Sequence, residues 1–177
     1  MSEDALQTFT QTARAAWSSL NTELVAAMHG ATVRLLEAPN DEPWLRSLHA
    51  DAPESRELYR DPKHGFLLLA HTERAGLYRP PHDHGRGWVI YAVQRGEMLM
   101  STYRRLHDLR GQAYLVRRET FLLRSGDVRV FLPEDIHDTR CTQGPLTLLR
   151  MTSRDFKNEE LTRYPEPQDI EGNPTAP

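Results

Sequence analysis

From residue 66 to residue 151 the chain is a series of short apolar runs separated by turn residues, and this feature limits the possible folds more than any other. The strand-like runs are 66–71, 76–78, 88–94, 98–103, 113–116, 121–123, 128–132 and 146–151. Short strands that recur roughly every 8–12 residues are typical of sandwiches and barrels. This part of the chain therefore predicts a mainly β fold.

The first part of the chain has a different periodicity. From Leu6 to Met28, apolar residues recur at steps of three and four, which predicts one amphipathic helix that ends near Gly30 as its C-cap. A second helix is predicted from Asp41 to just before Pro53. We expect a helical segment at 1–60, a barrel at 61–157, and a disordered tail at 158–177, where prolines replace apolar residues.

Composition narrows the class of protein. The formal net charge is −3 and the 22 basic residues form no long block, so a nucleic-acid role has little electrostatic support. The acidic start lacks the apolar core of a signal peptide, and no apolar run approaches the length of a membrane span. Cys141 is the only cysteine and cannot form an internal disulfide. We expect a soluble cytoplasmic protein, monomeric or homodimeric, that acts on a small molecule without contacting nucleic acid or membrane.

Three histidines stand in positions that suit a metal ion. His82 and His84 form a His-x-His pair, which on a strand points both imidazoles to one face. His137 follows 53 residues after His84, beyond a second strand-like run. Three imidazoles from two β segments leave open positions on a divalent ion, as reactive metal sites require. His82, His84 and His137 are therefore the predicted metal ligands.

Several other polar residues are predicted to have structural roles and not functional ones. His29, His49, His64 and His107 are interpreted as surface or satisfied core residues. Asp83 is predicted to make hydrogen bonds within its loop and not to act as a catalytic acid. The thiol of Cys141 has no base beside it in sequence and is interpreted as packed and inert.

The order of these motifs resembles that of the cupin superfamily, whose fold is a double-stranded β-helix (jelly-roll) barrel. The first cupin motif pairs His-x-His with a later glycine, here Gly96. The second runs from Gly-Asp through Pro to His, here Gly126-Asp127, Pro133 and His137. The resemblance covers about residues 60–155 and implies a cupin barrel with an N-terminal helical segment.

Within the cupins, the chain looks most like the thiol dioxygenases of the cysteine dioxygenase type. Many cupins have a Glu ligand four or five residues after His-x-His, but Trp88 and Val89 stand there, which implies an all-histidine set. The family often places a carboxylate-binding Arg where Arg60 follows Tyr59. The chain departs from the family at its cross-linked Cys and Tyr, where Val89 and Thr152 stand, and it lacks the Ser-His-Tyr triad. A distant branch with another substrate is therefore implied.

A neutral three-histidine site leaves the full charge of Fe(II) in place, which favours a small anionic chelating substrate and O₂. Imidazole also suits Zn, Ni, Cu and Mn. Tyr91 and Arg150 are the candidates for catalytic contacts, although Tyr91 also fits a place in the core and Arg150 also fits a solvent-facing one. Arg60, Tyr59 and Arg79 are the candidates for substrate binding, and for Arg60 a surface salt bridge is the alternative.

Three functions remain open from the sequence. The first is a non-haem iron dioxygenase, an oxidoreductase for which a thiol is the leading substrate. The second is a metal-binding cupin without redox chemistry, such as a small-molecule sensor. The third is a metal-dependent isomerase or lyase on the same scaffold.

Overall fold

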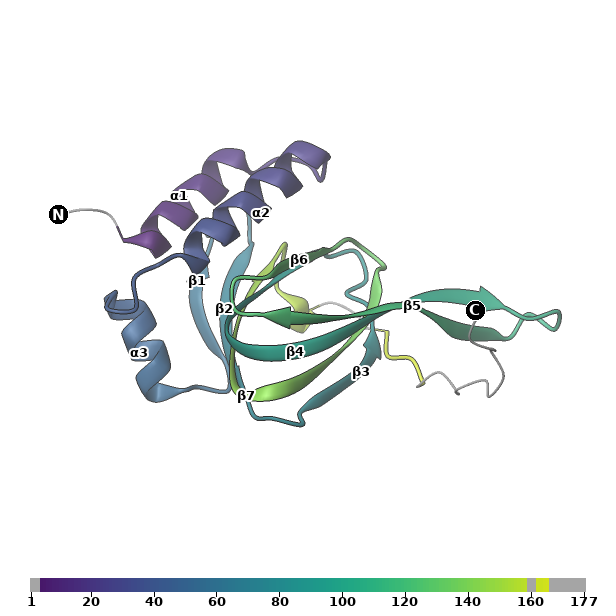
Figure 1. Ribbon diagram of the computed structural model, residues 1–177. Helices are drawn as coiled ribbons and strands as arrows, with labels where there is room; N and C mark the ends of the chain where they lie inside the picture. Colours follow the sequence, from purple (N-terminus) through teal and green to yellow (C-terminus); the bar gives the residue numbers. More distant parts are fainter. Residues whose placement is uncertain (1–3, 159–161, 166–177) are drawn as a thin grey trace, which may run out of the picture.

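The computed structural model describes residues 4–158 and 162–165 of the chain. Three helices, α1 (Ala5–Ala16), α2 (Thr22–Leu36) and α3 (Pro43–Asp51), precede the strands. Figure 1 shows the helices at one side of a β barrel. The strands are β1 (Arg56–Arg60), β2 (Leu67–Glu73), β3 (Tyr78–His82), β4 (Val89–His107), β5 (Ala113–Arg124), β6 (Val128–Phe131) and β7 (Ile136–Thr152), and a short 3-10 helix, η1 (Phe156–Asn158), follows.

Two long antiparallel strands, β4 and β7, form the centre of the barrel. They pair from Val89 opposite Thr152 to Tyr103 opposite Ile136. The first half of β4 also pairs with β6 and the second half with β5, while β7 pairs with β3 and then with β2. The two halves thus form two facing sheets, ordered β1-β2-β7-β4-β6 and β3-β7-β4-β5. This arrangement is a cupin double-stranded β-helix with N-terminal helices, which confirms the predicted fold class.

Both central strands bend where they pass from one sheet to the other. The pairing register between β4 and β7 shifts around Arg95 and Glu97. Gly96 lies at this bend with φ +90°, and a Cβ there would lie 2.7 Å from the carbonyl oxygen of Gln143. Only glycine accepts both the positive φ and the close approach. The glycine of the first motif is therefore a requirement of the bend.

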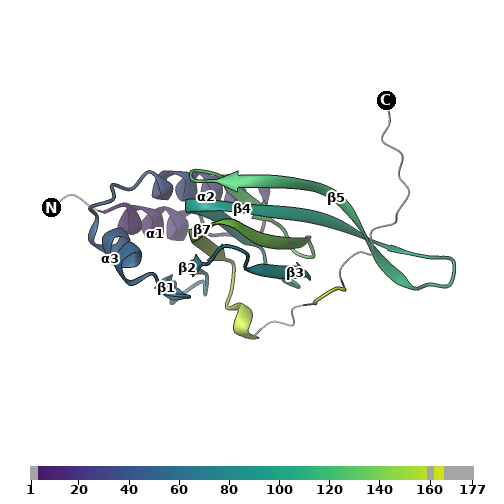
Figure 2. The same ribbon diagram turned by 60° about the horizontal axis from the view of Figure 1, so that its bottom comes forward.

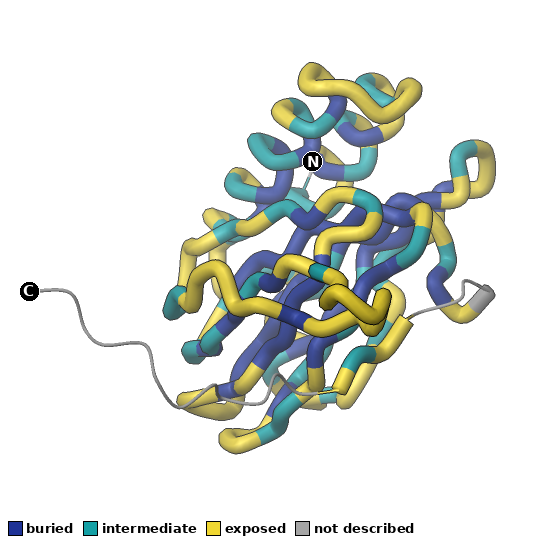
Figure 3. The backbone as a smooth tube through the Cα atoms, turned by 90° about the vertical axis from the view of Figure 1, so that its right-hand side faces the viewer, coloured by how far each residue is buried: buried dark blue, intermediate teal, exposed yellow. Residues whose placement is uncertain are grey.

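The core has two parts, separated by the first sheet. On its outer face, Leu68, Ile90 and Met151 pack with the apolar sides of the helices. On its inner face, Val89, Tyr91 and Leu148 pack with residues of the second sheet inside the barrel. Figure 3 shows the buried backbone in dark blue along the central strands, with exposed loops around them. The site lies on the inner face.

The prediction for the first helix is wrong in two respects. The predicted single helix is two helices, because Asn21 begins a new one by accepting a hydrogen bond from the backbone N–H of Leu24 at 2.8 Å. Gly30 lies within α2 and is not its C-cap. The second predicted helix is confirmed as α3, with Pro43 in its first turn. None of the described helices is long and apolar enough to cross a membrane.

The strand predictions also need corrections. Runs 88–94 and 98–103 are parts of β4, and runs 113–116 and 121–123 are parts of β5. Strand β1, which lies within the segment expected to be helical, and the first half of β7 were not predicted from the sequence. The β4–β5 hairpin extends beyond the barrel (Figures 1 and 2).

The predicted disordered tail is described only at 158 and 162–165, and its other residues lie outside the described part. Arg163 forms an isolated β-bridge with His82, and the backbone N–H of Tyr164 donates to the carbonyl of Pro81 at 2.9 Å. At these residues the segment pairs with the end of β3, and the disorder of the rest of the tail stays a prediction.

Candidate metal centre

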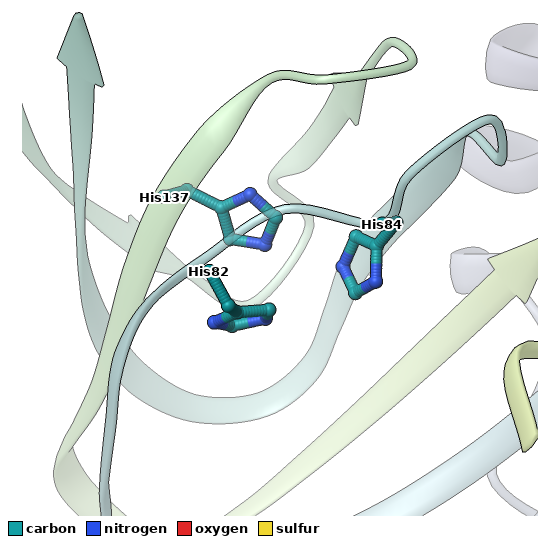
Figure 4. A group of neighbouring side chains, drawn as sticks. All are labelled: His82, His84 and His137. Carbon is teal, nitrogen blue, oxygen red and sulfur yellow. The ribbon is translucent and has the colours of Figure 1, made fainter. Parts of the chain in front are cut away.

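The three predicted ligands lie together inside the barrel. The ring centroids of His82 and His84 are 5.0 Å apart, those of His82 and His137 are 4.7 Å apart, and those of His84 and His137 are 5.2 Å apart. One potential ligand atom from each ring lies within 4.8 Å of the other two. Figure 4 shows the rings facing a common space between β3, the turn after it, and β7. Among the described residues, no carboxylate belongs to this group.

Local structure explains how the imidazoles meet. His82 is the last residue of β3 and pairs with His137 across the sheet. His84 lies in the turn beyond, so the prediction that both residues of the His-x-His pair lie on one strand is wrong. Asp83 shapes this turn: its carboxylate accepts hydrogen bonds from the N–H of Gly85 at 2.9 Å and from the hydroxyl of Tyr164 at 2.7 Å. These bonds match the loop role predicted for Asp83.

Burial keeps the three imidazoles neutral. Desolvation lowers the pKa of His84 to about 3 and that of His137 well below its ordinary value, and it also lowers the pKa of His82. Neutral imidazole is the form that binds a metal ion. Nδ1 of His82 lies 2.8 Å from the carbonyl oxygen of Pro80, so it donates a proton there and leaves Nε2 as the ligand atom.

The residues present fit a divalent ion. Nδ1 of His84 and Nδ1 of His137 are buried and have no hydrogen-bond partner among the described residues. Buried polar atoms are normally paired, and the cost of leaving them unpaired is about 1–3 kcal/mol each. Three converging neutral imidazoles, two of them with unsatisfied nitrogens, are a donor set that imidazole-preferring metals complete.

Tyr91 adjoins the histidines. Its hydroxyl lies 3.2 Å from Nε2 of His84 and 3.3 Å from Nε2 of His137. The ring is 4% exposed, and burial raises the pKa of the phenol, which keeps it protonated. Of the two alternatives left open for Tyr91, the structure supports both, because the ring packs in the core and the hydroxyl reaches the site.

Two phenylalanines that the sequence analysis did not identify cover the imidazoles. Phe131 of β6 stacks on His137 with ring centroids 4.1 Å apart, and Phe156 of η1 stacks on His84 at 4.6 Å. Phe156 also fits against Gly87, where an added Cβ would lie 2.2 Å from its ring. Nothing in the local sequence marked these residues, because their positions depend on the closure of the barrel.

A pocket of about 270 Å³ opens between β5 and β6. Thr102 of β4 and Phe131 of β6 line it, together with Phe121 of β5, Arg129 of β6 and the start of β7 at Ile136. Thr102 pairs with His137 across the sheet, and Phe131 contacts the His137 ring. The pocket therefore reaches the layer of side chains that surrounds the histidines.

Arg150 faces the barrel interior. It pairs with Tyr91 across β4 and β7, and its positive charge lowers the pKa of all three histidines as well as that of Tyr91. The Nε of Arg150 is buried without a hydrogen-bond partner among the described residues. The open question about Arg150 is therefore answered in favour of the interior.

The structure does not bring Arg60 or Tyr59 to the histidines. Arg60 lies on edge strand β1, where its guanidinium pairs with Glu57 at 2.7 Å and with Asp155 at 3.0 Å. The Tyr59 hydroxyl donates to Asp61 at 3.0 Å, and its ring packs against Phe66. For Arg60, the structure gives the alternative, a surface salt bridge, in place of substrate binding. Tyr59, also predicted to bind substrate, instead contacts Asp61 and Phe66.

Arg79 occupies an intermediate position. Its guanidinium donates to Oε1 of Glu73 at 2.9 and 3.2 Å, and its side chain is half exposed. Its charge lowers the pKa of His82 and Tyr91, so it lies near the site without contacting the three histidines in the described structure.

Cys141 is 1% exposed in the inner core, as an inert thiol would be.

Among known proteins, only solved structures are similar to this chain. No family model matches the sequence, and no curated protein matches it. Solved structures with a similar fold include KdgF from Halomonas sp., with 16% identity, a TM-score of 0.46, and coverage of 58% of this chain and 82% of that one.

Two further similar structures are cupins of other organisms. The cupin domain of Schizosaccharomyces pombe Cnp3 has 11% identity and a TM-score of 0.43, covering 55% of this chain and 57% of that one. A cupin superfamily protein from Desulfitobacterium hafniense DCB-2 has 17% identity and a TM-score of 0.42, covering 57% and 76%. At such identities and TM-scores, no activity is carried over from these proteins to this chain.

Proposed function

We propose that this protein is a metal-dependent enzyme that binds one Fe(II) ion through His82, His84 and His137. The observation that carries the proposal is the convergence of three neutral imidazoles, two of them buried and that of His82 partly exposed, with no carboxylate among the described residues beside them. Imidazole ligands bind Fe, Zn, Cu and Ni, and three protein ligands leave positions open for substrate. A closed structural site would fill all its positions with protein atoms.

Charge favours an anionic substrate. Three neutral imidazoles do nothing to offset the double positive charge of the ion, and the guanidinium of Arg150 faces the same interior. Positive charges in a poorly solvated interior are costly unless they are paired. A small anion that contacts both the ion and Arg150 would supply the missing negative charge.

The chain's own residues position and protect such a substrate. The Tyr91 hydroxyl, between His84 and His137, holds a proton that it can donate to a substrate atom beside them. Phe131 and Phe156 cover the imidazole faces and exclude water. Bound Fe(II) would supply open coordination positions for a chelating anion and for O₂. We propose oxidation of a small anionic substrate, and the resemblance to thiol dioxygenases makes a thiol the first choice.

The experiment that tests this proposal combines metal analysis with O₂ consumption. Protein purified from iron-supplemented cells is analysed for bound metals, and O₂ uptake is followed with cysteine, 3-mercaptopropionate, cysteamine and a 1,3-diketone. We expect bound iron and uptake that depends on one of the anionic substrates. The variant His137→Ala should abolish uptake, whereas His107→Ala, on the exposed end of β4, should not change it.

Bound zinc or nickel without O₂ uptake for any substrate would overturn the dioxygenase proposal. It would instead favour a sensor, isomerase or lyase that uses the same three histidines without redox chemistry. Uptake that survives His137→Ala would show that the reaction does not involve this site.

A further inference from the structure

Three polar atoms on the inner face of β2 and β7 have no hydrogen-bond partner among the described residues. They are Nε2 of His71, Oε2 of Glu73 and Nε of Arg150, and all three are buried. Native proteins rarely leave buried polar atoms unpaired, and a missing ligand is one explanation. None of these atoms belongs to the three-histidine group.

Strand geometry places the three side chains along one face of the sheet, with His71 between Glu73 and Arg150. His71 and Glu73 are two residues apart on β2, so they point to the same face. Arg150 lies opposite Leu69 on the adjacent strand, which makes it a diagonal neighbour of His71. The charge of Arg150 lowers the pKa of His71, as expected for side chains that lie close together.

The three atoms differ in hydrogen-bonding character. Arg150 Nε is a donor that carries positive charge. Nδ1 of His71 lies 3.2 Å from the carbonyl oxygen of Glu54, so Nδ1 holds the ring proton and Nε2 is an acceptor. Burial lowers the pKa of His71 to about 4, which keeps this neutral form at neutral pH.

Glu73 supplies a second acceptor. The residue is 3% exposed, and its Oε1 accepts two hydrogen bonds from Arg79 while Oε2 accepts none. A buried carboxylate oxygen without a donor is an expensive feature of a folded protein. The face therefore presents one cationic donor beside two acceptors.

We propose that this face binds the end of the substrate that is remote from the metal, and that this end is a carboxylate with an adjacent amino or hydroxyl group. The carboxylate accepts hydrogen bonds from Arg150, and the amino or hydroxyl group donates to Glu73 or His71. The inference rests on the proposed function, because it concerns the same interior. A simple anion without a donor, such as acetate, would satisfy Arg150 but would leave Oε2 of Glu73 unpaired.

This face lies close enough to the three histidines for one small substrate to contact both. Arg150 pairs with Tyr91 across the sheet, and the Tyr91 hydroxyl lies 3.2 Å from Nε2 of His84. The charges of Arg150, Arg79 and Glu73 all act on the Tyr91 phenol. Arg150, His71 and His82 are partly exposed, whereas Glu73 and His137 are buried, so solvent reaches the open end of this polar face.

The test is a binding series with simple probes. Binding of alanine, lactate, propionate and alaninamide to the zinc-loaded and the metal-free protein is measured by isothermal titration calorimetry or by NMR chemical-shift changes. We expect alanine or lactate to bind at least about tenfold more tightly than propionate, which lacks the donor, and alaninamide, which lacks the carboxylate. Equal affinity for alanine, lactate and propionate, or binding of none of them, would overturn the proposal.

Substitutions then assign the contacts. Arg150→Gln should weaken binding of the preferred probe at least about tenfold, and Glu73→Gln should reduce its preference over propionate. Arg140→Gln, on the exposed face of the same strand, is the matched control and should bind like the wild type. If Arg150→Gln does not fold, Arg150→Lys and the probe series on the wild type decide.

Metal content separates this inference from the proposed function. Arg150→Gln and Glu73→Gln should hold as much zinc as the wild type, because neither residue is a ligand. If the wild type binds no metal but keeps the probe preference, the proposed function fails and this inference stands. If metal binds and the probes are not distinguished, this inference alone fails.

Discussion

Replacing His71 with asparagine should reduce the acid sensitivity of the fold. The pKa of His71 is lowered from 6.5 to about 4 in the folded protein, mainly by burial and then by the charge of Arg150. Because the folded-state pKa is below the unfolded one, the unfolded chain binds the proton first as pH falls. Stability is therefore fully present above the unfolded pKa and is lost as pH falls from about 6.5 towards 4.

The magnitude follows from the two pKa values. At about pH 5 the unfolded imidazole is protonated and the folded one is not. This pH lies about 1.5 units below the unfolded pKa, so the loss of folding free energy is about 2 kcal/mol. Partial exposure of the ring reduces this to about 1–2 kcal/mol. Asparagine does not titrate, and its amide can still donate to the carbonyl of Glu54 as Nδ1 does.

Urea denaturation of the chelator-treated protein measures this effect. The wild type and His71→Asn are compared at several pH values between about 7.5 and 5, with His107→Asn as the control on an exposed histidine. His82, His84 and His137 also have lowered pKa values, so they destabilise all three proteins to the same extent as pH falls. The difference in unfolding free energy between the wild type and His71→Asn therefore reports on His71. An equal loss in the wild type and His71→Asn would refute the argument.

Further substitutions test the fold and the site. Gly96→Ala should destabilise the barrel by about 1–3 kcal/mol, because of the φ of +90° and the 2.7 Å approach to Gln143, and an unchanged urea midpoint would contradict this. Tyr91→Phe should cost about 1–3 kcal/mol in the chelator-treated protein by leaving Nε2 of His84 and of His137 unpaired, and an unchanged urea midpoint would contradict this. Phe66→Ala should cost about 3–5 kcal/mol in thermal or urea unfolding, since Phe66 is 0% exposed beneath Trp17.

The fold and the three-histidine cluster could be predicted from sequence because their signals are local. Apolar runs between turn residues indicate strands. The two short motifs that contain His82, His84 and His137 can be recognised in the sequence however the strands bend. The continuity of β4 through residue 95 could not be read, because Arg95 and Gly96 look like turn residues until β7 pairs across the bend. The break between α1 and α2 was hidden because apolar steps continue through Leu20.

The proposed substrate-binding face was harder to predict because it depends on contacts between distant strands. Arg60 fits a position assigned by resemblance, yet Asp155, 95 residues later, pairs with it at the surface. His71 and Glu73 were not singled out as site residues, although the alternation of β2 places both on one face. Only the pairing of β2 with β7 puts that face beside Arg150 and inside the barrel.

The central claim is that three histidines hold one metal ion, and an anaerobic Fe(II) titration of chelator-treated protein tests it most directly. The account predicts one ion per chain in the wild type and in His49→Ala, whose histidine contacts Gln94 outside the three-histidine group. His82→Ala, His84→Ala and His137→Ala should each bind far less iron while remaining folded. Stoichiometric iron in any of these three variants would contradict the account.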